Sequence, residues 1–245
     1  EHIYTNQVQP YFRAPHIFVG FPMRYHNPGW SAQSQALPGR ETRERRAAQN
    51  ERFGAAMSDA VFMTSRDGRH WYYFGDRKPF IPLGPEGSWK PGYLRAVNLA
   101  NAGGPIVKDD EVWYYYRGGN IDGPKRTWVY GTGLAILRRD GFASLNSDED
   151  GGLAITRPFI FDGKGDLFVN VDVARDGELR IAVVDEDTAQ DIEGFGYADA
   201  VPLCADATRI AVHWRQRDSL ALLKDRYVRL AFHLRCAKLY SFWIV

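Results

Sequence analysis

Short hairpins that turn at acidic and glycine residues constrain this chain more than any other feature. The stretch Met57–Trp71, MSDAVFMTSRDGRHW, contains one of them. Ala60–Ser65 is apolar and bulky enough for a short buried strand. Arg66–Arg69 is predicted to turn, because Asp bonds its own backbone and Gly tolerates a positive φ. Trp71 opens the next strand, where we expect its indole to cover the hairpin as a core residue.

Similar units recur along the chain, so the sequence predicts a repeated all-β protein. Two more hairpins are predicted at Gly104–Gly118 and Gly131–Leu145, with turns at Asp109-Asp110 and Asp140-Gly141. Their turns lie about 30 to 40 residues apart, which suits the blades of a β-propeller better than the tighter spacing of a sandwich. Residues 113–116, all aromatic, are predicted to be strand core residues.

The first part of the chain combines strands with a polar insertion. Strands are predicted at Tyr11–Pro15 and His16–Tyr25, and residues 27–56 form the insertion. Within it, Arg40–Phe53 is rich in Arg and Glu and predicts a short helix with an ion pair between Glu41 and Arg45. A solvated helix on the surface is favoured over a phosphate-binding role for its arginines.

The second part of the chain changes character at the acidic segment Asn146–Gly152. This segment lacks the alternating ligands of a calcium loop, so a solvated linker is predicted. A turn at Arg175–Gly177 is expected within the part that follows. About six strands in 147–245 indicate a β-sandwich, against a partial propeller of about two blades in 1–146. The six are predicted at residues 153–161, 167–173, 178–185, 209–214, 227–234 and 239–245.

Composition excludes several classes of function. The net charge is +1, so no overall field favours nucleic acid, and no apolar run is long enough for a membrane helix. The aromatic fraction of 14% is typical of sheets and of sugar-binding clefts. Cys204 and Cys236 are either paired or free, and nothing in the sequence has the spacing of a metal site or a cofactor motif.

Several segments resemble a family of secreted glycosidases. They include EHIYTNQVQPYFRAPHIFVGFPMRY, DAVFMTSRDGRHW, GGLAITRPFIFDGKGDLFVNVDV, IEGFGYADAVPL and the closing HWRQRDSLALLKDRYVRLAFHLRCAKLYSFWIV. The resemblance covers nearly the whole chain. It implies a five-bladed propeller related to glycoside hydrolase families 32 and 43, then a C-terminal β-sandwich of jelly-roll type. It also implies a secreted or periplasmic protein whose partners are a carbohydrate substrate and N-terminal blades missing from this chain.

The families resembled use two aspartates and a glutamate from early blades, so most of that set would lie upstream. Canonical glycosidase chemistry needs carboxyl groups on both sides of the scissile bond. Glu1 and Asp59 are the candidate catalytic carboxyls here, because each precedes a predicted strand near the propeller axis. The turn that contains Asp67 resembles the structural Asp-box hairpins of propellers, so Asp67 is not a catalytic candidate.

Substrate-binding candidates lie near the same strands or in long Pro- and Gly-rich loops. An indole face can stack on the apolar face of a pyranose, while polar side chains can bond sugar hydroxyls. Arg13 and Arg24 are either cations of the site or members of internal salt bridges. The candidates are His2, Tyr4, Asn6, Arg13, Arg24, Trp30, Trp89, Arg95 and Asn98.

The sequence therefore predicts a glycoside hydrolase-like protein that acts on a poly- or oligosaccharide and needs no cofactor. Two alternatives remain open. One is a non-catalytic carbohydrate-binding protein with the same aromatic residues. The other is a glycoside phosphorylase, in which Arg and His would bind phosphate in place of an attacking water.

Overall fold

The structure is a computed structural model that describes all residues except 6, 38, 83–103, 123–126 and 161–164, together with the side chains outside 120–130. Strands make up 48% of it and helices 9%, so the protein is all-β. The chain divides into two compact units. Unit 1 comprises Glu1–Lys108 and Val112–Ile136, and unit 2 comprises Asp109–Glu111 and Leu137–Val245.

Unit 1 begins with an antiparallel meander whose strands are interrupted midway. Its two sheets have the orders β1-β4-β5 and β2-β3-β6-β7. The pairing of Gly20 with Met63 and of Met23 with Ala60 keeps one register across both sheets. The strands are β1 (His2–Tyr4), β2 (Gln9–Tyr11), β3 (Ala14–Gly20), β4 (Met23–His26), β5 (Met57–Ala60), β6 (Met63–Ser65) and β7 (Tyr72–Tyr73).

The single strand predicted over Ala60–Ser65 is wrong, because the segment leaves one sheet and enters the other. Val61 and Phe62 lie between β5 and β6 and are buried, at 1% and 5% exposed. The amide of Val61 donates to the carbonyl of Pro22 at 3.1 Å, so one hydrogen bond bridges the interruption. The predicted strand His16–Tyr25 is divided at the same level, between β3 and β4, where Pro22 has no N–H to give to a ladder.

The predicted turn after β6 is confirmed. Asp67 Oδ1 accepts from the amides of Arg69 and His70, both at 2.8 Å, and Gly68 has a φ of 70°. Trp71, expected in the core, is only half-buried, and its Nε1–H donates to the carbonyl of Gly68 at 3.3 Å. The indole therefore braces the turn instead of filling a core.

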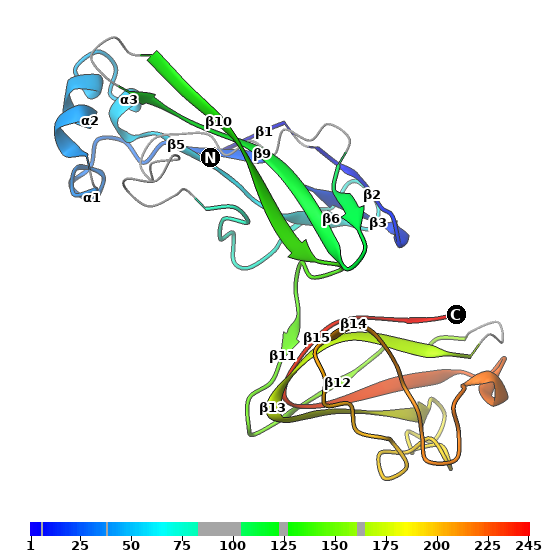
Figure 1. Ribbon diagram of the computed structural model, residues 1–245. Coiled ribbons are helices and arrows are strands. Elements are labelled where there is room, and N and C mark those ends of the chain that lie inside the picture. Colours follow the sequence, from blue (N-terminus) through cyan, green and yellow to red (C-terminus); the bar gives the residue numbers. More distant parts are fainter. Residues whose placement is uncertain (6, 38, 83–103, 123–126, 161–164) are drawn as a thin grey trace. The chain divides into compact units, whose positions relative to one another are not determined.

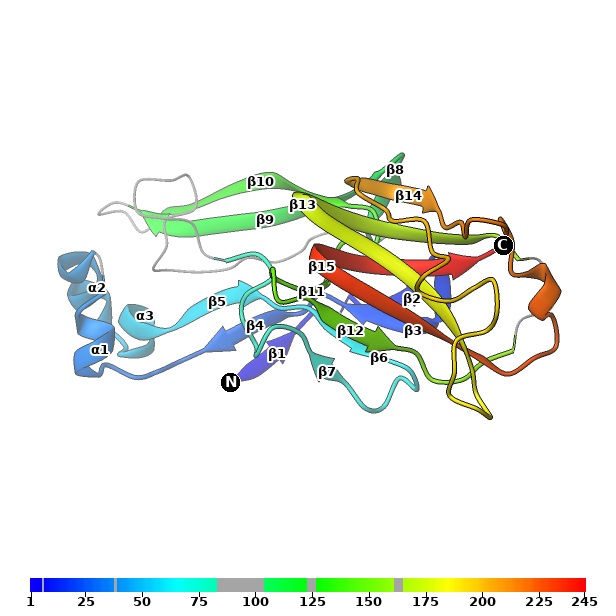
Figure 2. The same ribbon diagram turned by 90° about the horizontal axis from the view of Figure 1, so that it is seen from below.

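The polar insertion between β4 and β5 holds three helices and not the single predicted one. Both views place them together at one end of the unit 1 strands (Figures 1 and 2). The i,i+4 ion pair among the described side chains joins Arg40 and Glu44 at 2.6 Å, in place of the predicted Glu41–Arg45 pair. The helices are α1 (Ala32–Gln35), α2 (Arg40–Ala47) and α3 (Arg52–Ala55).

Arg43 corrects the expectation that this insertion is a solvated helix. Its side chain is fully buried and donates to the carbonyls of Gln35, Leu37 and Gly54. These carbonyls belong to helix ends and the loop between helices, where backbone acceptors lack intrahelical partners. One buried guanidinium thus joins all three helices.

A second meander completes unit 1, in the order β10-β9-β8. The predicted hairpin at Asp109-Asp110 is confirmed between β8 (Ile106–Lys108) and β9 (Glu111–Asp122). The turn predicted at Asp140-Gly141 is present, with the Gly141 amide donating to the carbonyl of Arg138 at 2.9 Å, but the hairpin predicted at Gly131–Leu145 is wrong. Residues 131–138 belong to β10 (Thr127–Arg138), which pairs with β9, and the next strand lies in unit 2.

The aromatic run on β9 alternates, so it is not all core as predicted. Tyr114 is 1% exposed and Tyr115 is 40% exposed, while Trp113 is half-buried. The ring of Tyr114 lies 4.9 Å from that of Phe21 and 5.8 Å from that of Phe80. This aromatic cluster packs the second meander against the first in one core.

Unit 2 is built on one five-stranded sheet in the order β11-β15-β13-β14, with β12 also paired to β15. Its core is apolar and includes Trp214, which is 1% exposed and donates to the carbonyl of Ile181 at 2.9 Å. The elements are β11 (Leu145–Asn146), β12 (Gly152–Ile155), β13 (Leu167–Asp185), β14 (Ala207–Ala211), the short helix η1 (Ala221–Leu223) and β15 (Val228–Ile244).

The turn predicted at Arg175–Gly177 is wrong, because β13 continues through it. The strand keeps pairing with β15 on both sides, from Val173 with Ala237 to Glu178 with Arg235. The register shifts between these pairs, which is the mark of a bulge. A Cβ at position 177 would lie 2.5 Å from the carbonyl oxygen of Cys236, so glycine is needed there.

The same pairing joins the last two predicted strands, 227–234 and 239–245, into β15.

The acidic segment predicted as a linker also belongs to unit 2. Ser147 N donates to the carbonyl of Ala237, and the carbonyl of Asp148 accepts from the amide of Cys236 at 2.8 Å. Both cysteines are free thiols.

Candidate functional site

The centre of the candidate site is an ion pair between two neighbouring strands of unit 1. Arg24 on β4 lies opposite Asp59 on β5 in the sheet register. Its Nε donates to Asp59 Oδ1 at 2.8 Å and its Nη2 to Oδ2 at 2.6 Å, which makes the pair bidentate. The side chains are only 14% and 12% exposed. The hydrogen bond to Asp59 raises the pKa of Arg24.

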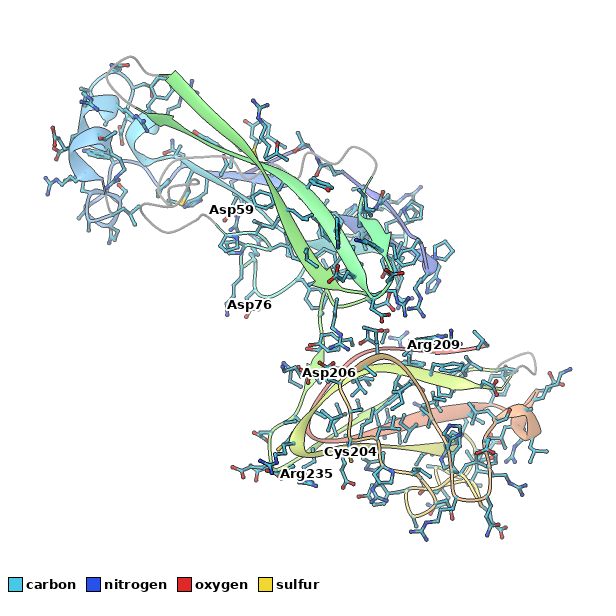
Figure 3. The ribbon with its side chains drawn as sticks, in the orientation of Figure 1. Asp59, Asp76, Cys204, Asp206, Arg209 and Arg235 are labelled. Atoms are coloured by element: carbon cyan, nitrogen blue, oxygen red, sulfur yellow. The ribbon has the colours of Figure 1, made fainter. Side chains whose placement is uncertain are left out.

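A loop between β7 and Ile81 lies against this pair. The carbonyl of Arg77 accepts from Arg24 Nη1 at 2.5 Å. Gly75, Asp76 and Arg77 have φ values of 63°, 53° and 62°, three left-handed residues in succession. Two of them carry a Cβ, for which this conformation is uncommon and costs energy. Figure 3 labels Asp59 and Asp76 in this part of unit 1.

Arg77 connects Glu1 to the pair. Its Nη1 lies 3.7 Å from Glu1 Oε2, and its guanidinium carbon lies 5.2 Å from the centroid of the Tyr73 ring. The Glu1 side chain is 28% exposed, and its charge also favours the protonated form of Arg24. We call Glu1, Arg24, Asp59 and Arg77 the charged cluster.

Three aromatic rings occupy the opposite face of the same sheet. His2 pairs with Tyr25 in the register, while Ile3 pairs with Arg24, so the two sets alternate between faces. The His2 ring lies 5.9 Å from the ring of Tyr25 and 6.2 Å from that of Tyr4, and the two tyrosine rings are 6.2 Å apart, edge to face. Tyr4 is 46% exposed. We call His2, Tyr4 and Tyr25 the aromatic group.

The structure therefore brings the two predicted carboxyls into one cluster and places His2 and Tyr4 on the other face. Both sets meet at β1, which is an edge strand of its sheet among the residues that the structure describes. A ligand that lies along an edge strand can contact side chains on both faces. Arg24 makes the internal salt bridge that one of its two predicted roles requires, and its role as a cation of the site stays a prediction.

The remaining predicted residues do not join this cluster. Arg13 lies in the turn between β2 and β3, which belong to a different sheet from the β4–β5 pair. Trp30 packs inside the helical insertion, with the Arg43 guanidinium carbon 5.3 Å from its ring centroid and its amide bonded to Glu51 Oε1 at 2.7 Å. Asn6, Trp89, Arg95 and Asn98 lie outside the described residues.

Asp59 has limited capacity for proton transfer in this arrangement. Both of its oxygens accept hydrogen bonds from one guanidinium, so neither oxygen can take part in proton transfer without giving up a contact with Arg24. A general acid must carry a proton, and a nucleophile must reach its substrate. Glu1 is the more accessible carboxyl, at the edge of the sheet. The cluster as it stands can bind and orient a polar ligand.

Sequence reasoning missed three residues of this site: Tyr25, Tyr73 and Arg77. Tyr25 follows Arg24 by one position and therefore falls on the other face, which the strand period alone could have indicated. Arg77 had no such signal, because only the fold brings its loop against β4. Among the described residues, no group of three or more His, Cys, Asp and Glu side chains could hold a metal ion.

No protein-family model matches this chain, and no curated protein matches it. In the part of the chain that the structure describes, no helix is long and apolar enough to cross a membrane.

Proposed function

We propose that this protein is glycoside hydrolase-like and binds a poly- or oligosaccharide along the β1 edge of unit 1. The observation that carries the proposal is that β1 holds two rings of the aromatic group and directly follows Glu1 of the charged cluster, whose other members lie on β4, on β5 and in the loop after β7. Aromatic rings present an apolar surface to the C–H face of a sugar ring. Carboxylate and guanidinium groups supply acceptors and donors for its hydroxyls.

The two meanders support a propeller-like reading of unit 1, as the resemblance implies. A propeller blade is a four-stranded antiparallel sheet, and the first meander has four strand levels: β1 with β2, β3 with β4, β6 with β5, and β7. In such a fold the first strand of a blade lines the central axis, which is where β1 would place Glu1. We propose a β-sandwich of jelly-roll type for unit 2.

A second candidate, a carbohydrate-binding protein without catalysis, is favoured by the state of Asp59. Glycosidases use two carboxyl groups with separate roles, one as acid and one as base or nucleophile. With Asp59 fully engaged by Arg24, Glu1 is the one accessible carboxyl of the charged cluster. Binding therefore needs only the side chains described, whereas hydrolysis needs a further carboxyl.

Titration calorimetry with neutral hexasaccharides tests the proposal. The probes are xylohexaose, cellohexaose and a fructan hexasaccharide, each added to the full chain and also assayed for release of reducing sugar. We expect Tyr4→Ala to weaken binding at the unit 1 site at least tenfold. Tyr72→Ala is the matched control, because Tyr72 lies on β7 and is 68% exposed. Failure to bind any of the three probes, or equal losses in both variants, would contradict the proposal.

Hydrolysis separates the two candidates. Sugar release that is lost in Glu1→Gln but retained in Tyr72→Ala would support the hydrolase. Binding by a chain that releases no reducing sugar would support the non-catalytic candidate.

A further inference from the structure

The outer face of the unit 2 sheet carries a second group of exposed side chains. Along β13, Leu179 and Ile181 point into the core, so Arg180 between them points outward. Arg180 pairs with His233 on β15, and His233 pairs with Leu153 on β12. These three side chains form a row across three strands. Leu153 is 57% exposed.

Tyr197 lies over this row and is held rigidly. Its amide donates to Asp191 Oδ2 at 2.8 Å, and its ring lies 4.6 Å from the ring of His233. The guanidinium carbon of Arg180 lies 5.4 Å from the centroid of the Tyr197 ring. The ring is nevertheless 42% exposed. A rigid, exposed aromatic ring binds a ligand at low entropic cost.

Arg180 is also fixed in place. Its Nε donates to Glu178 Oε2 at 3.0 Å and its Nη1 to the carbonyl of Ala200 at 3.3 Å. Among the described residues, its Nη2 has no hydrogen-bond partner. An oriented guanidinium with a donor to spare is suited to a hydroxyl or carbonyl acceptor. We call Leu153, Arg180, Tyr197 and His233 the Tyr197 platform.

The charges around the platform balance. Arg180 and Arg235 are offset by Glu178 and Asp191, and Arg235 Nη2 lies 3.9 Å from Glu178 Oε1. Figure 3 labels Arg235, which lies on β15 beside this row. Burial lowers the pKa of His233, so its imidazole is neutral at pH 7. A surface without net charge does not select nucleic acid, phosphate or an acidic peptide.

We propose that the Tyr197 platform is a binding site for an uncharged oligosaccharide, separate from the charged cluster of unit 1. The Tyr197 ring would stack on the C–H face of one sugar residue, and the exposed Leu153 would contact its neighbour. Arg180 Nη2 and the imidazole of His233 would bond hydroxyl groups. The ligand class is that of the proposed function, and the inference rests on it to that extent.

The test uses the full chain with Tyr4→Ala, so that the unit 1 site is disabled. Xylohexaose, cellohexaose and a fructan hexasaccharide are titrated, with tetragalacturonate as the charged comparison. We expect this variant to retain binding of a neutral hexasaccharide and to bind tetragalacturonate at least tenfold more weakly. Adding Tyr197→Ala should reduce the neutral affinity at least tenfold, whereas Tyr197→Phe should keep it. Tyr227→Ala is the matched control, because Tyr227 is 61% exposed near the start of β15.

Arg180→Gln provides a second route, should Tyr197→Ala fail to fold by circular dichroism. It keeps a shorter polar side chain at this position but loses the guanidinium, and we expect at least a fivefold loss of affinity. Unchanged binding in both unit 2 variants would overturn the inference. Loss of all binding in Tyr4→Ala alone would also overturn it, while leaving the proposed function intact. If Tyr197→Ala alone abolished sugar binding while Tyr4→Ala left it unchanged, the proposed unit 1 site would be contradicted instead.

Discussion

The two units use charged side chains differently. In unit 1, Arg24 and Asp59 are 14% and 12% exposed and bonded at two points between neighbouring strands. In unit 2, Arg229 and Glu186 form a pair that is 35% and 29% exposed, and Asn170 is the one buried polar side chain among its described residues. A buried ion pair is weak evidence of stability, since its desolvation offsets its attraction. The difference is the one expected if the charges of unit 1 serve the proposed function and the unit 2 core serves as a scaffold.

The largest effect should come from that scaffold. Trp214 is 1% exposed and bonded to the backbone of β13, whereas Trp71 in unit 1 is half-buried beside a turn. Truncating a core tryptophan costs about 3–5 kcal/mol, because a cavity adds to the lost transfer free energy. We expect Trp214→Ala to lower the stability of unit 2 by about 4 kcal/mol. Urea unfolding followed by circular dichroism measures it.

Trp71→Ala is the matched comparison and should cost about 1 kcal/mol, the net value of a hydrogen bond and some packing. If Trp71→Ala destabilised the protein as much as Trp214→Ala, the assignment of its indole to the turn would be wrong. Near-UV circular dichroism of the two variants would show which unit had lost its packing.

The second largest effect should come from breaking the Arg24–Asp59 pair. Asp59→Asn removes the counter-charge that is bonded directly to the Arg24 guanidinium, whose side chain is only 14% exposed. The cost for a fully buried pair is about 3–5 kcal/mol, and for this slightly exposed pair we expect about 2 kcal/mol. Thermal unfolding in low and high salt measures it. Glu186→Gln, at the more exposed pair of unit 2, should have a much smaller effect that salt further reduces.

An Asp59→Asn variant that is as stable as the parent chain would show that the pair is not a buried structural charge. A second variant, Arg24→Met with Asp59→Leu, distinguishes stability from function. If the pair serves function, the double variant should regain the stability of the parent chain while its sugar affinity stays low.

The sequence predicted those parts of the fold that local chemistry determines. The turns at Asp67 and at Asp109 were found because the residues that make them are neighbours in the chain. The bulge at Gly177 was mistaken for a turn because the same residue types suit both. Only the partner strand decides between them, and Cys236 lies far away in the sequence. Residues 131–138 were likewise assigned to the wrong hairpin, because their partner is the preceding strand β9 and not a strand that follows them.

The candidate site was predicted in part for the same reason. Glu1 and Asp59 were identified as carboxyls near strand ends, but the bidentate contact with Arg24 depends on a register that no local pattern sets. Arg77 was not found, because its left-handed backbone occurs without the glycine that normally signals it. Its role comes from a loop that returns to β4 from another strand.

The smallest expected effect is the titration of the turn after β6. Asp67 Oδ2 lies 2.6 Å from His70 Nδ1, and this hydrogen bond lowers the pKa of Asp67 and raises that of His70. The stability from the His70 shift is fully present below the ordinary histidine pKa of about 6.5 and is lost as pH rises through the raised value. The stability from the Asp67 shift is present above about pH 4 and is lost as pH falls. The turn should therefore be most stable between about pH 4 and pH 6.5.

An NMR titration of the His70 Cε1–H proton should give a midpoint above that of the same proton in Asp67→Asn. Equal midpoints would show that the contact does not persist in solution. Because both groups are solvent-exposed, we expect high salt to narrow the difference. If high salt left the difference between the two midpoints unchanged, the Asp67–His70 contact would be less exposed to solvent than it is in the structure.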